Sequence, residues 1–465
     1  MKKKLCTQIS NATLERIKSA RVISKLISPF FHTYYTYCVY IRRRPMGTSE
    51  YQKNLFQSLG FDIQQSLSFD ISSEAPHGSF LEDFDIALFK GDNIKWLKTL
   101  TNNKAEFVDL IYIDPPYNTH SNFLYDDSRK GHGGIPAFGQ HSAWMEFMLN
   151  RLIIARDLLK STGILAVSID DYEQPYLRIL LDNLFGEANF IANIVVTRSK
   201  NGKGSNKSVA TNHEYLLVYG KSSESALVGI PALPDDYTLR DEHGFYKVDG
   251  LFRKKGDASR REDRPNMFYP LYVCTESGNV FTQKIRNDLL EIYPVDSKGV
   301  ERRWLWGADK AKNDSWMLYG SKKGVIYVKN YFNDQKRIKP RSIWDDNRYL
   351  TERATNEIKE IYGSKIFDTP KPLGFMEDII QHFTHKEAII LDFFAGSGTT
   401  AHAACNLNKS DGGNRKVILM EDMHTIKKNH AAYKAGFLFG ADITAQRIKY
   451  IQETNQKELL VKIYD

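Results

Sequence analysis

An acidic residue, two prolines and an aromatic residue stand together in the tetrapeptide Asp114-Pro115-Pro116-Tyr117. The run before it, Val108 to Ile113, is apolar except for Asp109 and rich in β-branched residues, which predicts a buried strand. Neither proline can donate to a ladder, so Asp114 is expected at the carboxyl end of that strand, where open α/β sheets bind ligands. A carboxylate, the Pro115 carbonyl and a ring for stacking suit a flat heterocycle that carries an amino group.

A second motif combines a strand, a glycine turn and a helix. Ala388 to Phe393 has the pattern of a buried strand, and it runs into Phe394-Ala395-Gly396-Ser397-Gly398 before a helix begins. Glycines let a backbone approach a ligand closely, and a helix N-terminus adds partial positive charge, so the segment predicts a nucleotide-binding turn. The third glycine of the dinucleotide fingerprint is missing, and no lysine follows as it does in a P-loop.

Two further strand ends carry acids. The strand predicted over Lys416 to Met420 ends at Glu421, where an acid can hold ribose hydroxyls. The expected ligand is therefore a nucleoside without a phosphate chain, a description that S-adenosylmethionine fits. The apolar run Ile86 to Phe89 leads into Gly91-Asp92-Asn93, and two interpretations of Asp92 stay open: it caps the next helix, or it accepts a hydrogen bond from an amino group of the ligand.

The rest of the pattern predicts the elements that position these strand ends. Helices are predicted over Trp144–Lys160, ended by Gly163, and over Tyr172–Leu184, Met376–Phe383 and Ala441–Glu453, with further strands over Ile164–Ile169, Ile191–Thr197 and Tyr215–Tyr219. Residues 222–345 differ, because short strands, turns and aromatic–basic clusters such as Arg302-Arg303-Trp304-Leu305-Trp306 replace the regular α/β pattern. They predict an inserted β-rich module, whose charge runs form either a solvated face or a nucleic-acid surface.

Composition narrows the class of protein further. The 465 residues carry a net charge of +8, with 42% hydrophobic and 26% charged residues, as in a globular protein of two or three domains. The basic charge fits nucleic-acid binding, and many proteins without that function share it. The four cysteines are scattered, so we expect a reducing cytoplasm and neither a disulfide framework nor a metal site. Charged and helix-breaking residues interrupt the apolar stretch Val22 to Ile41, which excludes a membrane span there, and Met46 is an alternative start.

The two motifs together resemble the amino-methyltransferases of DNA. An acid first in the tetrapeptide resembles the N6-adenine type, since the N4-cytosine type usually has a serine there. The catalytic motif precedes the cofactor motif and a long insert separates them, which is similar to the β class. Longer matches resemble the modification (Mod) subunit of type III restriction–modification systems; they are Asp114 to Thr119, Ser168 to Asp171, Asn212 to Tyr215, Arg260 to Pro265, Ser342 to Asp346 and Thr369 to Pro372.

This resemblance, which covers residues 84 to 452, implies a fold and a division of the chain. The fold is the α/β, class I S-adenosylmethionine-dependent methyltransferase fold, with seven mostly parallel strands in circularly permuted order and an antiparallel last strand. The insert implied is a mostly-β target-recognition domain. The expected parts are an N-terminal extension (1–80), a catalytic half (81–221), the target-recognition insert (222–345) and a cofactor-binding half (346–465).

The resemblance also implies a site-specific DNA methyltransferase that modifies adenine N6 after base flipping. Asp114 and the Pro115 carbonyl would accept the N–H groups of the amine, and Tyr117 would stack on the base, next to Pro116. Residues implied at the cofactor, S-adenosylmethionine, are Asp92, Lys371, Pro372, Asp392, Phe394, Gly396, Gly398 and Glu421. No metal is needed.

Expected partners are double-stranded DNA and a second copy of the chain. A restriction (Res) subunit is a third possible partner. Whether the chain has this partner stays open, because the chain ends sooner after the cofactor motif than Mod subunits usually do. Two alternatives remain: a catalytically idle DNA-recognition subunit, and an RNA or small-molecule methyltransferase on the same fold. The intact tetrapeptide speaks against the first, and the large basic–aromatic insert favours a long polymer as substrate.

Overall fold

The structure is a computed structural model that describes residues 83–118, 141–201, 209–455 and 458–465. The expectations for the N-terminal extension and for Met46 lie outside the described residues. Among the residues that are described, none of the helices is long and apolar enough to cross a membrane.

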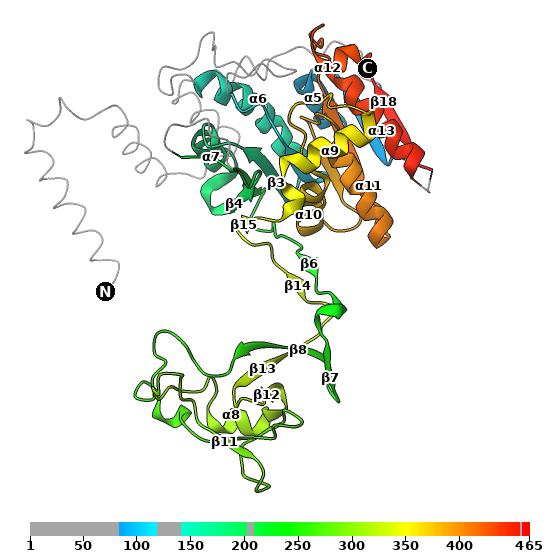
Figure 1. The fold of residues 1–465 in the computed structure, drawn as a ribbon. Helices are drawn as coiled ribbons and strands as arrows, with labels where there is room; N and C mark the ends of the chain where they lie inside the picture. Colours follow the sequence, from blue (N-terminus) through cyan, green and yellow to red (C-terminus); the bar gives the residue numbers. More distant parts are fainter. Residues whose placement is uncertain (1–82, 119–140, 202–208, 456–457) are drawn as a thin grey trace, which may run out of the picture.

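A sheet of nine strands forms the centre of the larger part of the molecule (Figure 1). In spatial order the strands are β15 (Ile343–Trp344), β4 (Phe190–Thr197), β5 (His213–Gly220), β3 (Leu159–Ile169), β2 (Val108–Ile113), β16 (Ile389–Asp392), β17 (Lys416–Glu421), β1 (Ile86–Lys90) and β18 (Val461–Tyr464). β5 runs antiparallel to both neighbours, and the other described pairings in this sheet are parallel.

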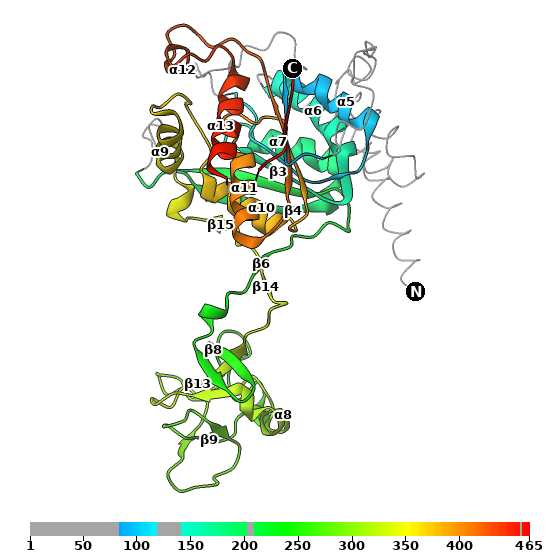
Figure 2. The same ribbon diagram turned by 90° about the vertical axis from the view of Figure 1, so that its right-hand side faces the viewer.

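Helices cover both faces of this sheet. One face packs on α5 (Asn93–Asn103), α6 (Ser142–Leu158) and α7 (Gln174–Leu181), through a core that includes Leu97, Leu152 and Leu177. The other face packs on α10 (Leu373–Phe383), α11 (Thr399–Asp411) and α13 (Gly440–Thr454), which lie to the left of α5 and α6 in Figure 2. The shorter α12 (Ala431–Lys434) and α9 (Thr351–Tyr362) contribute to a third cluster beside α13. Parallel strands buried on both faces explain why β2 is apolar except for Asp109.

The predicted strand order is confirmed. The seven strands from β4 to β1 are those that the resemblance implies: the catalytic strands and the β4–β5 hairpin come first in the chain, and the cofactor strands β16 and β17 come last. The antiparallel strand, β5, is the second strand of that hairpin, which corresponds to the last strand of the family fold. The sheet nevertheless extends beyond the prediction at both edges, because β15 pairs with β4 and β18 pairs with β1. Both are short segments without a distinct strand pattern, and pairing with a long neighbour stabilises them.

One predicted helix boundary is wrong. Gly163 was expected to end the helix that contains Trp144, but α6 ends at Leu158 and Gly163 lies inside β3. A Cβ atom on Gly163 would lie 3.1 Å from the Val108 carbonyl oxygen and 2.9 Å from a methyl group of Leu159. The glycine is therefore required by a close approach between neighbouring backbones and not by a helix cap.

The insert forms a separate lobe of small sheets, joined to the larger part by two chain segments that run side by side (Figures 1 and 2). These segments pair as β6 (Ile230–Pro231) and β14 (Arg337–Ile338). Beyond them, β12 (Leu318–Gly320), β13 (Ile326–Tyr331), β8 (Gly244–Leu251) and β7 (Leu239–Asp241) form one sheet, β10 (Val280–Phe281), β9 (Leu271–Val273) and β11 (Leu290–Ile292) form another, and α8 (Ala308–Asn313) is the lobe's helix. β15, near the end of the range 222–345, belongs to the large sheet instead.

Candidate active site

Four consecutive strands of the large sheet bring the predicted site residues to one edge. β2 ends before Asp114, β16 ends at Asp392 just before the glycine turn, β17 ends at Glu421, and β1 ends just before Asp92. These strands are neighbours in the order β2, β16, β17, β1, and they run parallel, so their carboxyl ends lie together. The structure therefore gathers residues that the sequence separates by about 300 positions, such as Asn93 and the Phe393 carbonyl, which are joined by a hydrogen bond of 2.8 Å.

Asp114, Tyr117 and Lys371 form a triangle of hydrogen bonds at the end of β2. The Tyr117 hydroxyl donates to Asp114 Oδ1 at 2.6 Å, and Lys371 Nζ donates to the same oxygen at 2.7 Å. Lys371 Nζ also lies 2.8 Å from the Tyr117 hydroxyl oxygen, to which it donates. Burial and the nearby Asp114 carboxylate raise the pKa of Tyr117 far above its usual value, so the hydroxyl keeps its proton and acts as a donor.

The loop that carries the tetrapeptide is fixed by side chains that the sequence did not single out. The Trp144 indole nitrogen of α6 donates to the Pro116 carbonyl at 2.6 Å. Asn118 adopts a left-handed backbone, with φ of 56°, and donates to the buried Glu173 carboxylate at 2.7 Å. His141 contacts the same carboxylate at 2.8 Å and stacks on Tyr176. Asparagine tolerates this backbone conformation better than most residues, and that was the one available signal.

The glycine turn between β16 and α11 is held from both sides. Gly396 and Gly398 have φ of 54° and 77°, a region that other residues enter only with strain. Glu421 Oε2 accepts the Gly396 backbone N–H at 2.6 Å, while Asp392 accepts the Phe394 N–H at 3.1 Å and also binds the Thr400 hydroxyl. Burial raises the pKa of Asp392 to about 7 and that of Glu421 to about 8. Asp392 therefore shapes the turn, and Glu421 sits directly beside it.

A buried arginine supports the same turn from behind. Arg447 of α13 has no exposed surface, and its Nη1 donates to the hydroxyls of Ser397 at 3.1 Å and Thr399 at 3.0 Å. The Thr444 hydroxyl, one helical turn earlier, donates to the Gly396 carbonyl at 2.6 Å. Sequence reasoning missed both residues, because each looks like part of an ordinary amphipathic helix.

The two remaining predicted cofactor residues have clear structural positions. Asp92 caps α5 by accepting the Ile94 N–H at 2.8 Å, so the capping interpretation is realised, and its second predicted role stays a prediction. Pro372 precedes the first residue of α10, Leu373, whose N–H is bound by the Glu357 carboxylate at 3.1 Å. Lys371, implied at the cofactor, directs its ammonium group to Asp114, and its role at the cofactor stays a prediction.

Within the described part of the chain, no group of three acidic, histidine or cysteine side chains could hold a metal ion. The hydrogen-bonding groups gathered at the strand ends are carboxylates, hydroxyls and backbone amides, and an aromatic ring lies among them. This combination can bind an amino-bearing heterocycle next to a nucleoside.

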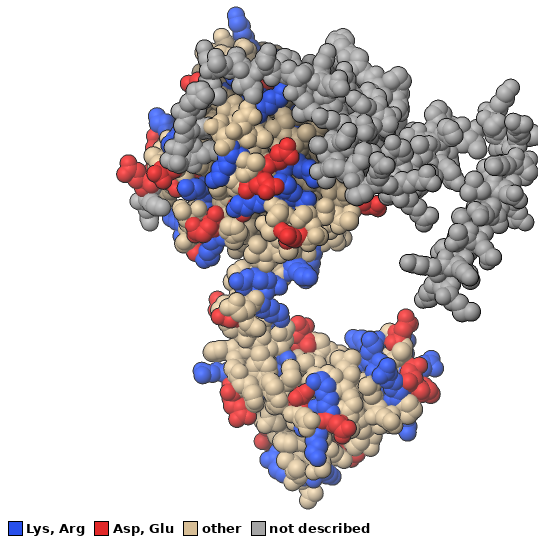
Figure 3. Space-filling model, turned by 180° about the vertical axis from the view of Figure 1, so that it is seen from behind, with Lys and Arg blue, Asp and Glu red and all other residues tan. Residues whose placement is uncertain are grey.

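The aromatic–basic clusters of the insert divide into interior and surface. Phe252 and Trp304 belong to these clusters, and both are almost fully buried and stack on each other in the core of the lobe. A small lobe has few large apolar side chains with which to form a core. Phe252 and Trp304 are therefore buried even though basic residues stand next to them in the sequence. Basic side chains remain outside, and Figure 3 shows Lys and Arg gathered where the two parts of the molecule join. The segment that contains β14 and leads back from the insert to the larger part is called the connecting segment below. Its exposed basic residues are Arg337, Lys339 and Arg341.

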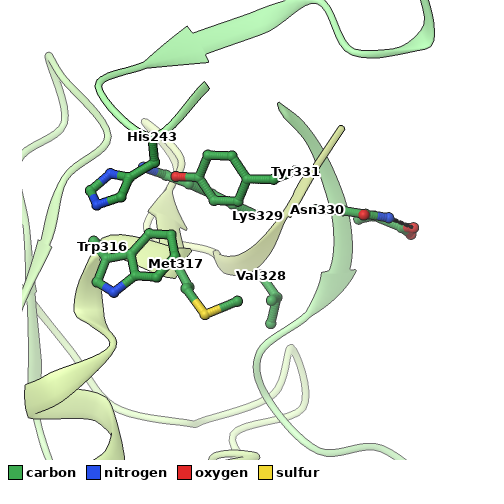
Figure 4. Close-up of a pocket in the computed structure, with 8 residues that line it drawn as sticks. His243, Trp316, Met317, Val328, Lys329, Asn330 and Tyr331 are labelled. Atoms are coloured by element: carbon green, nitrogen blue, oxygen red, sulfur yellow. Dashed lines mark hydrogen bonds between the residues drawn. The ribbon is translucent and has the colours of Figure 1, made fainter. Parts of the chain in front are cut away.

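A cavity of about 590 Å³ lies in the insert, away from the strand-end site (Figure 4). Trp316 is 40% exposed there, His243 stacks on it with ring centroids 4.2 Å apart, and Tyr331 lies 5.4 Å away. The remaining lining residues are Asp249, Met317, Val328, Lys329 and Asn330. The cavity thus presents an accessible aromatic ring beside polar groups.

Comparison with known proteins extends over both motifs. A family model described as DNA methylase matches residues 108–453. The chain is 53% identical to the Type II methyltransferase M.KpnI of Klebsiella pneumoniae over 376 residues, which cover 80% of this chain and 89% of that protein. It is 34% identical to the Mod subunit of the type III restriction-modification enzyme EcoPI from Escherichia phage P1 over 402 residues, and the match spans 78% of this chain but 62% of that subunit.

A solved structure of the PvuII DNA methyltransferase, described as cytosine-N4-specific, aligns with 81% of this chain and 95% of its own at 12% identity. Its TM-score is 0.39, so we draw nothing about function from that likeness.

Proposed function

The chain belongs to the DNA methylase family, and from this premise we propose that it transfers a methyl group from S-adenosylmethionine to N6 of adenine in double-stranded DNA. The observation that carries the proposal is the position of Asp114. Its carboxylate lies at the end of β2, next to Tyr117 and one strand away from the glycine turn after β16. A site-specific DNA methyltransferase needs an acceptor for the target amine beside its methyl donor, and this arrangement supplies one.

The chemistry requires help because the exocyclic amine of adenine is a poor nucleophile. Its lone pair is conjugated with the ring, so the nitrogen must become pyramidal before it can attack. The Asp114 carboxylate and the Pro115 carbonyl accept its two N–H groups and stabilise the positive charge that develops on nitrogen. The nitrogen takes the methyl group as the bond to sulfur breaks, which leaves S-adenosylhomocysteine, and it then loses one proton to solvent. The amine of cytosine would need the same help, so the choice of base rests on the resemblance: an acid at position 114 is typical of the adenine type and a serine of the cytosine type.

The target base must leave the duplex to reach this site. An extruded base loses its stacking partners in DNA, and an aromatic side chain can replace one of them. Tyr117 suits this role because its ring is partly exposed and its hydroxyl is tied to Asp114 at 2.6 Å. The ring and the carboxylate are therefore held in a fixed relation to each other.

S-adenosylmethionine supplies an electrophilic methyl group when it is bound. The glycine turn fits such a ligand, because a Cβ atom at Gly396 would lie 3.2 Å from the Phe367 ring and close the space between them. Glu421 would hold the ribose hydroxyls, Asp92 the adenine ring, and Phe394, Gly396 and Gly398 would shape the pocket. Asp392 orients the turn through the Phe394 N–H, and Lys371 and Pro372 border the same edge.

Target recognition is assigned to the insert. Its lobe connects to the catalytic part through a segment with exposed basic side chains, which suit contacts to phosphates. The cavity around Trp316 adds an exposed aromatic ring and hydrogen-bonding groups, which suit contact with a base. Phosphate contacts would set the register of the DNA, and the cavity would contribute to the choice of site.

We propose that the chain forms a homodimer, as the resemblance implies, and light scattering of the purified chain tests this assembly. The higher identity to the type II methyltransferase, 53% against 34% for the EcoPI Mod subunit, supports modification without an obligatory restriction subunit. Methylation by the purified chain alone tests that proposal, and a requirement for an added Res subunit would contradict it.

Modified-base sequencing of DNA from cells that express the chain tests the proposed function most directly. We expect N6-methyladenine at one short sequence, and the data also show whether one strand or both are marked. Competition between DNA and RNA duplexes for methyl transfer in vitro separates the RNA alternative. N4-methylcytosine, methylated RNA, or DNA binding without any methylation would each refute the proposal.

A further inference from the structure

We propose that Lys371 is a positioning residue for methyl transfer, which fixes Asp114 and Tyr117 in their reactive arrangement and does not bind the cofactor. The inference rests on the proposed function. Its basis is that the buried Lys371 ammonium group donates a hydrogen bond to Asp114 of the tetrapeptide, from which it is 257 positions away in the sequence.

Lys371 is anchored at both ends. Its backbone immediately precedes Pro372 and the start of α10, where the Glu357 carboxylate binds the Leu373 N–H. Its side chain is 8% exposed, and Nζ donates to Asp114 at 2.7 Å and to Tyr117 at 2.8 Å. The ammonium also lies 5.1 Å from the centroid of the Tyr117 ring. A lysine held this firmly is part of a built site and not a solvated surface charge.

The charges around Lys371 are balanced. Its Nζ lies 3.5 Å from the Glu214 carboxylate on β5, and Arg198 Nε approaches that carboxylate at 3.4 Å. Asp114, Glu214, Lys371 and Arg198 therefore form a cluster of two negative and two positive groups. A buried charge is strongly unfavourable unless it is paired. The cluster permits a carboxylate to stay ionised in a partly dry pocket, where the target amine needs it.

The geometry also divides the two oxygens of Asp114 between different tasks. Oδ1 is bound by both Tyr117 and Lys371, which fixes the rotation of the carboxylate. The second oxygen, Oδ2, is then the one presented to the base. Because Lys371 holds the Tyr117 hydroxyl as well, the plane of the ring is fixed relative to Oδ2. Stacking and hydrogen bonding to the same adenine require this relation.

A role at the cofactor leads to different behaviour. A lysine that binds the methionine end of S-adenosylmethionine would change cofactor affinity, whereas a lysine that positions Asp114 would change the rate of transfer at saturating cofactor. Lys371→Met removes the charge and keeps most of the volume. Lys371→Arg restores a cation that can reach the same oxygens with different geometry.

A control pair lies at the opposite end of the same strand. Lys160 contacts Asp109, at the start of β2, at 2.7 Å, the same distance as Lys371 to Asp114. Lys160→Met therefore breaks a lysine–aspartate pair on β2 far from the tetrapeptide. It reports the effect of such a loss on stability alone, although Lys160 is the more exposed of the two lysines.

The experiment compares single-turnover methylation of a DNA substrate by these variants at saturating S-adenosylmethionine. We expect Lys371→Met to be slower than wild type by about 100-fold, the loss typical of misplaced reacting groups. Cofactor affinity measured by calorimetry should stay within about threefold, Lys371→Arg should recover part of the rate, and Lys160→Met should match wild type. In an Asp114→Ala background, Lys371→Met should add little, because the carboxylate that Lys371 positions is absent and the Tyr117 ring is already released.

Three outcomes overturn the inference: an unchanged rate for Lys371→Met with unchanged cofactor binding, an unchanged rate with much weaker cofactor binding, or an additive effect in the Asp114→Ala background. The wild-type reaction separates these from failure of the proposed function. If wild-type protein does not methylate adenine in DNA, the proposed function is wrong; if it does and Lys371→Met is equally fast, only the inference about Lys371 is wrong.

Discussion

Replacing Asp114 with alanine is expected to remove nearly all methyl transfer and to leave S-adenosylmethionine binding intact. Loss of one preorganised hydrogen-bonding group at a reacting centre lowers a rate by about 10²–10³-fold, or about 2.7–4 kcal/mol. Asp114 also binds the Tyr117 hydroxyl at 2.6 Å and Lys371 at 2.7 Å, so its loss releases the stacking ring as well. We therefore expect a decrease near the upper end of that range, about 10³-fold.

The effect on stability should be smaller than the loss of a fully buried ion pair, which is about 3–5 kcal/mol. The Asp114 side chain is 24% exposed. After the loss of Asp114, the Lys371 ammonium still has the Glu214 carboxylate as an ionic partner at 3.5 Å. We expect the free energy of unfolding to fall by about 1–2 kcal/mol, discounted for this exposure and for the remaining partner.

Single-turnover transfer of a labelled methyl group to DNA, with enzyme in excess, measures the rate, and calorimetric titration measures cofactor affinity. Asp114→Asn is the matched control, since it keeps the volume and one acceptor oxygen, and it should lose less rate than Asp114→Ala. A rate for Asp114→Ala within about tenfold of wild type would refute the assignment of the amine to this carboxylate. Weakened cofactor binding with a normal rate at saturation would instead move Asp114 to the cofactor site.

Three further predictions concern the cofactor and the DNA. Burial raises the pKa of Glu421 to about 8, so the fraction of its carboxylate form, the better acceptor for ribose hydroxyls, increases as pH rises. Calorimetry between about pH 6 and pH 9 should therefore show that wild type binds S-adenosylmethionine more tightly as pH rises. Glu421→Gln should show a flatter dependence on pH. Trp316→Ala should weaken binding to target DNA by about 1–3 kcal/mol in a fluorescence titration, with cofactor affinity unchanged, whereas Leu305→Ala, elsewhere on the lobe, should not. Arg337, Lys339 and Arg341 are the exposed basic residues of the connecting segment that returns from the insert. Replacing them with neutral residues should make the slope of log affinity against log salt shallower by about 0.9 for each DNA phosphate contact that is lost.

The central strands were predictable because each is a buried apolar run that ends at an acid or a glycine. β2 and β17 begin where the sequence predicts and end within one residue of it, and the permuted order of the seven strands follows from the order of the motifs. The edge strands were not predictable, since β15 has two residues and depends on pairing with β4.

The site was predictable where a residue lies next to a strand end, and not where it reaches the site from elsewhere. Asp114, Glu421 and Asp392 follow from local pattern. The contact of Lys371 with Asp114 depends on how the start of α10 lies over β2, 257 positions away, and no local pattern carries that information. Arg447 shows the same limit, because a lone arginine on an amphipathic helix indicates a solvated face until the fold buries it completely.

The paired segments that connect the insert have a consequence for how such proteins diversify. Ile230 pairs with Ile338 and Pro231 with Arg337, so the chain leaves the catalytic part and returns to it at adjacent points. To the large sheet, the whole lobe is equivalent to one surface loop, and the entropy of closing a loop rises only by about 0.6 kcal/mol for each doubling of its length. A lobe of another size or architecture could therefore be exchanged at this point with little disturbance to the strand-end site. Evolution, or a protein engineer, could change the sequence that is read while the chemistry stays the same.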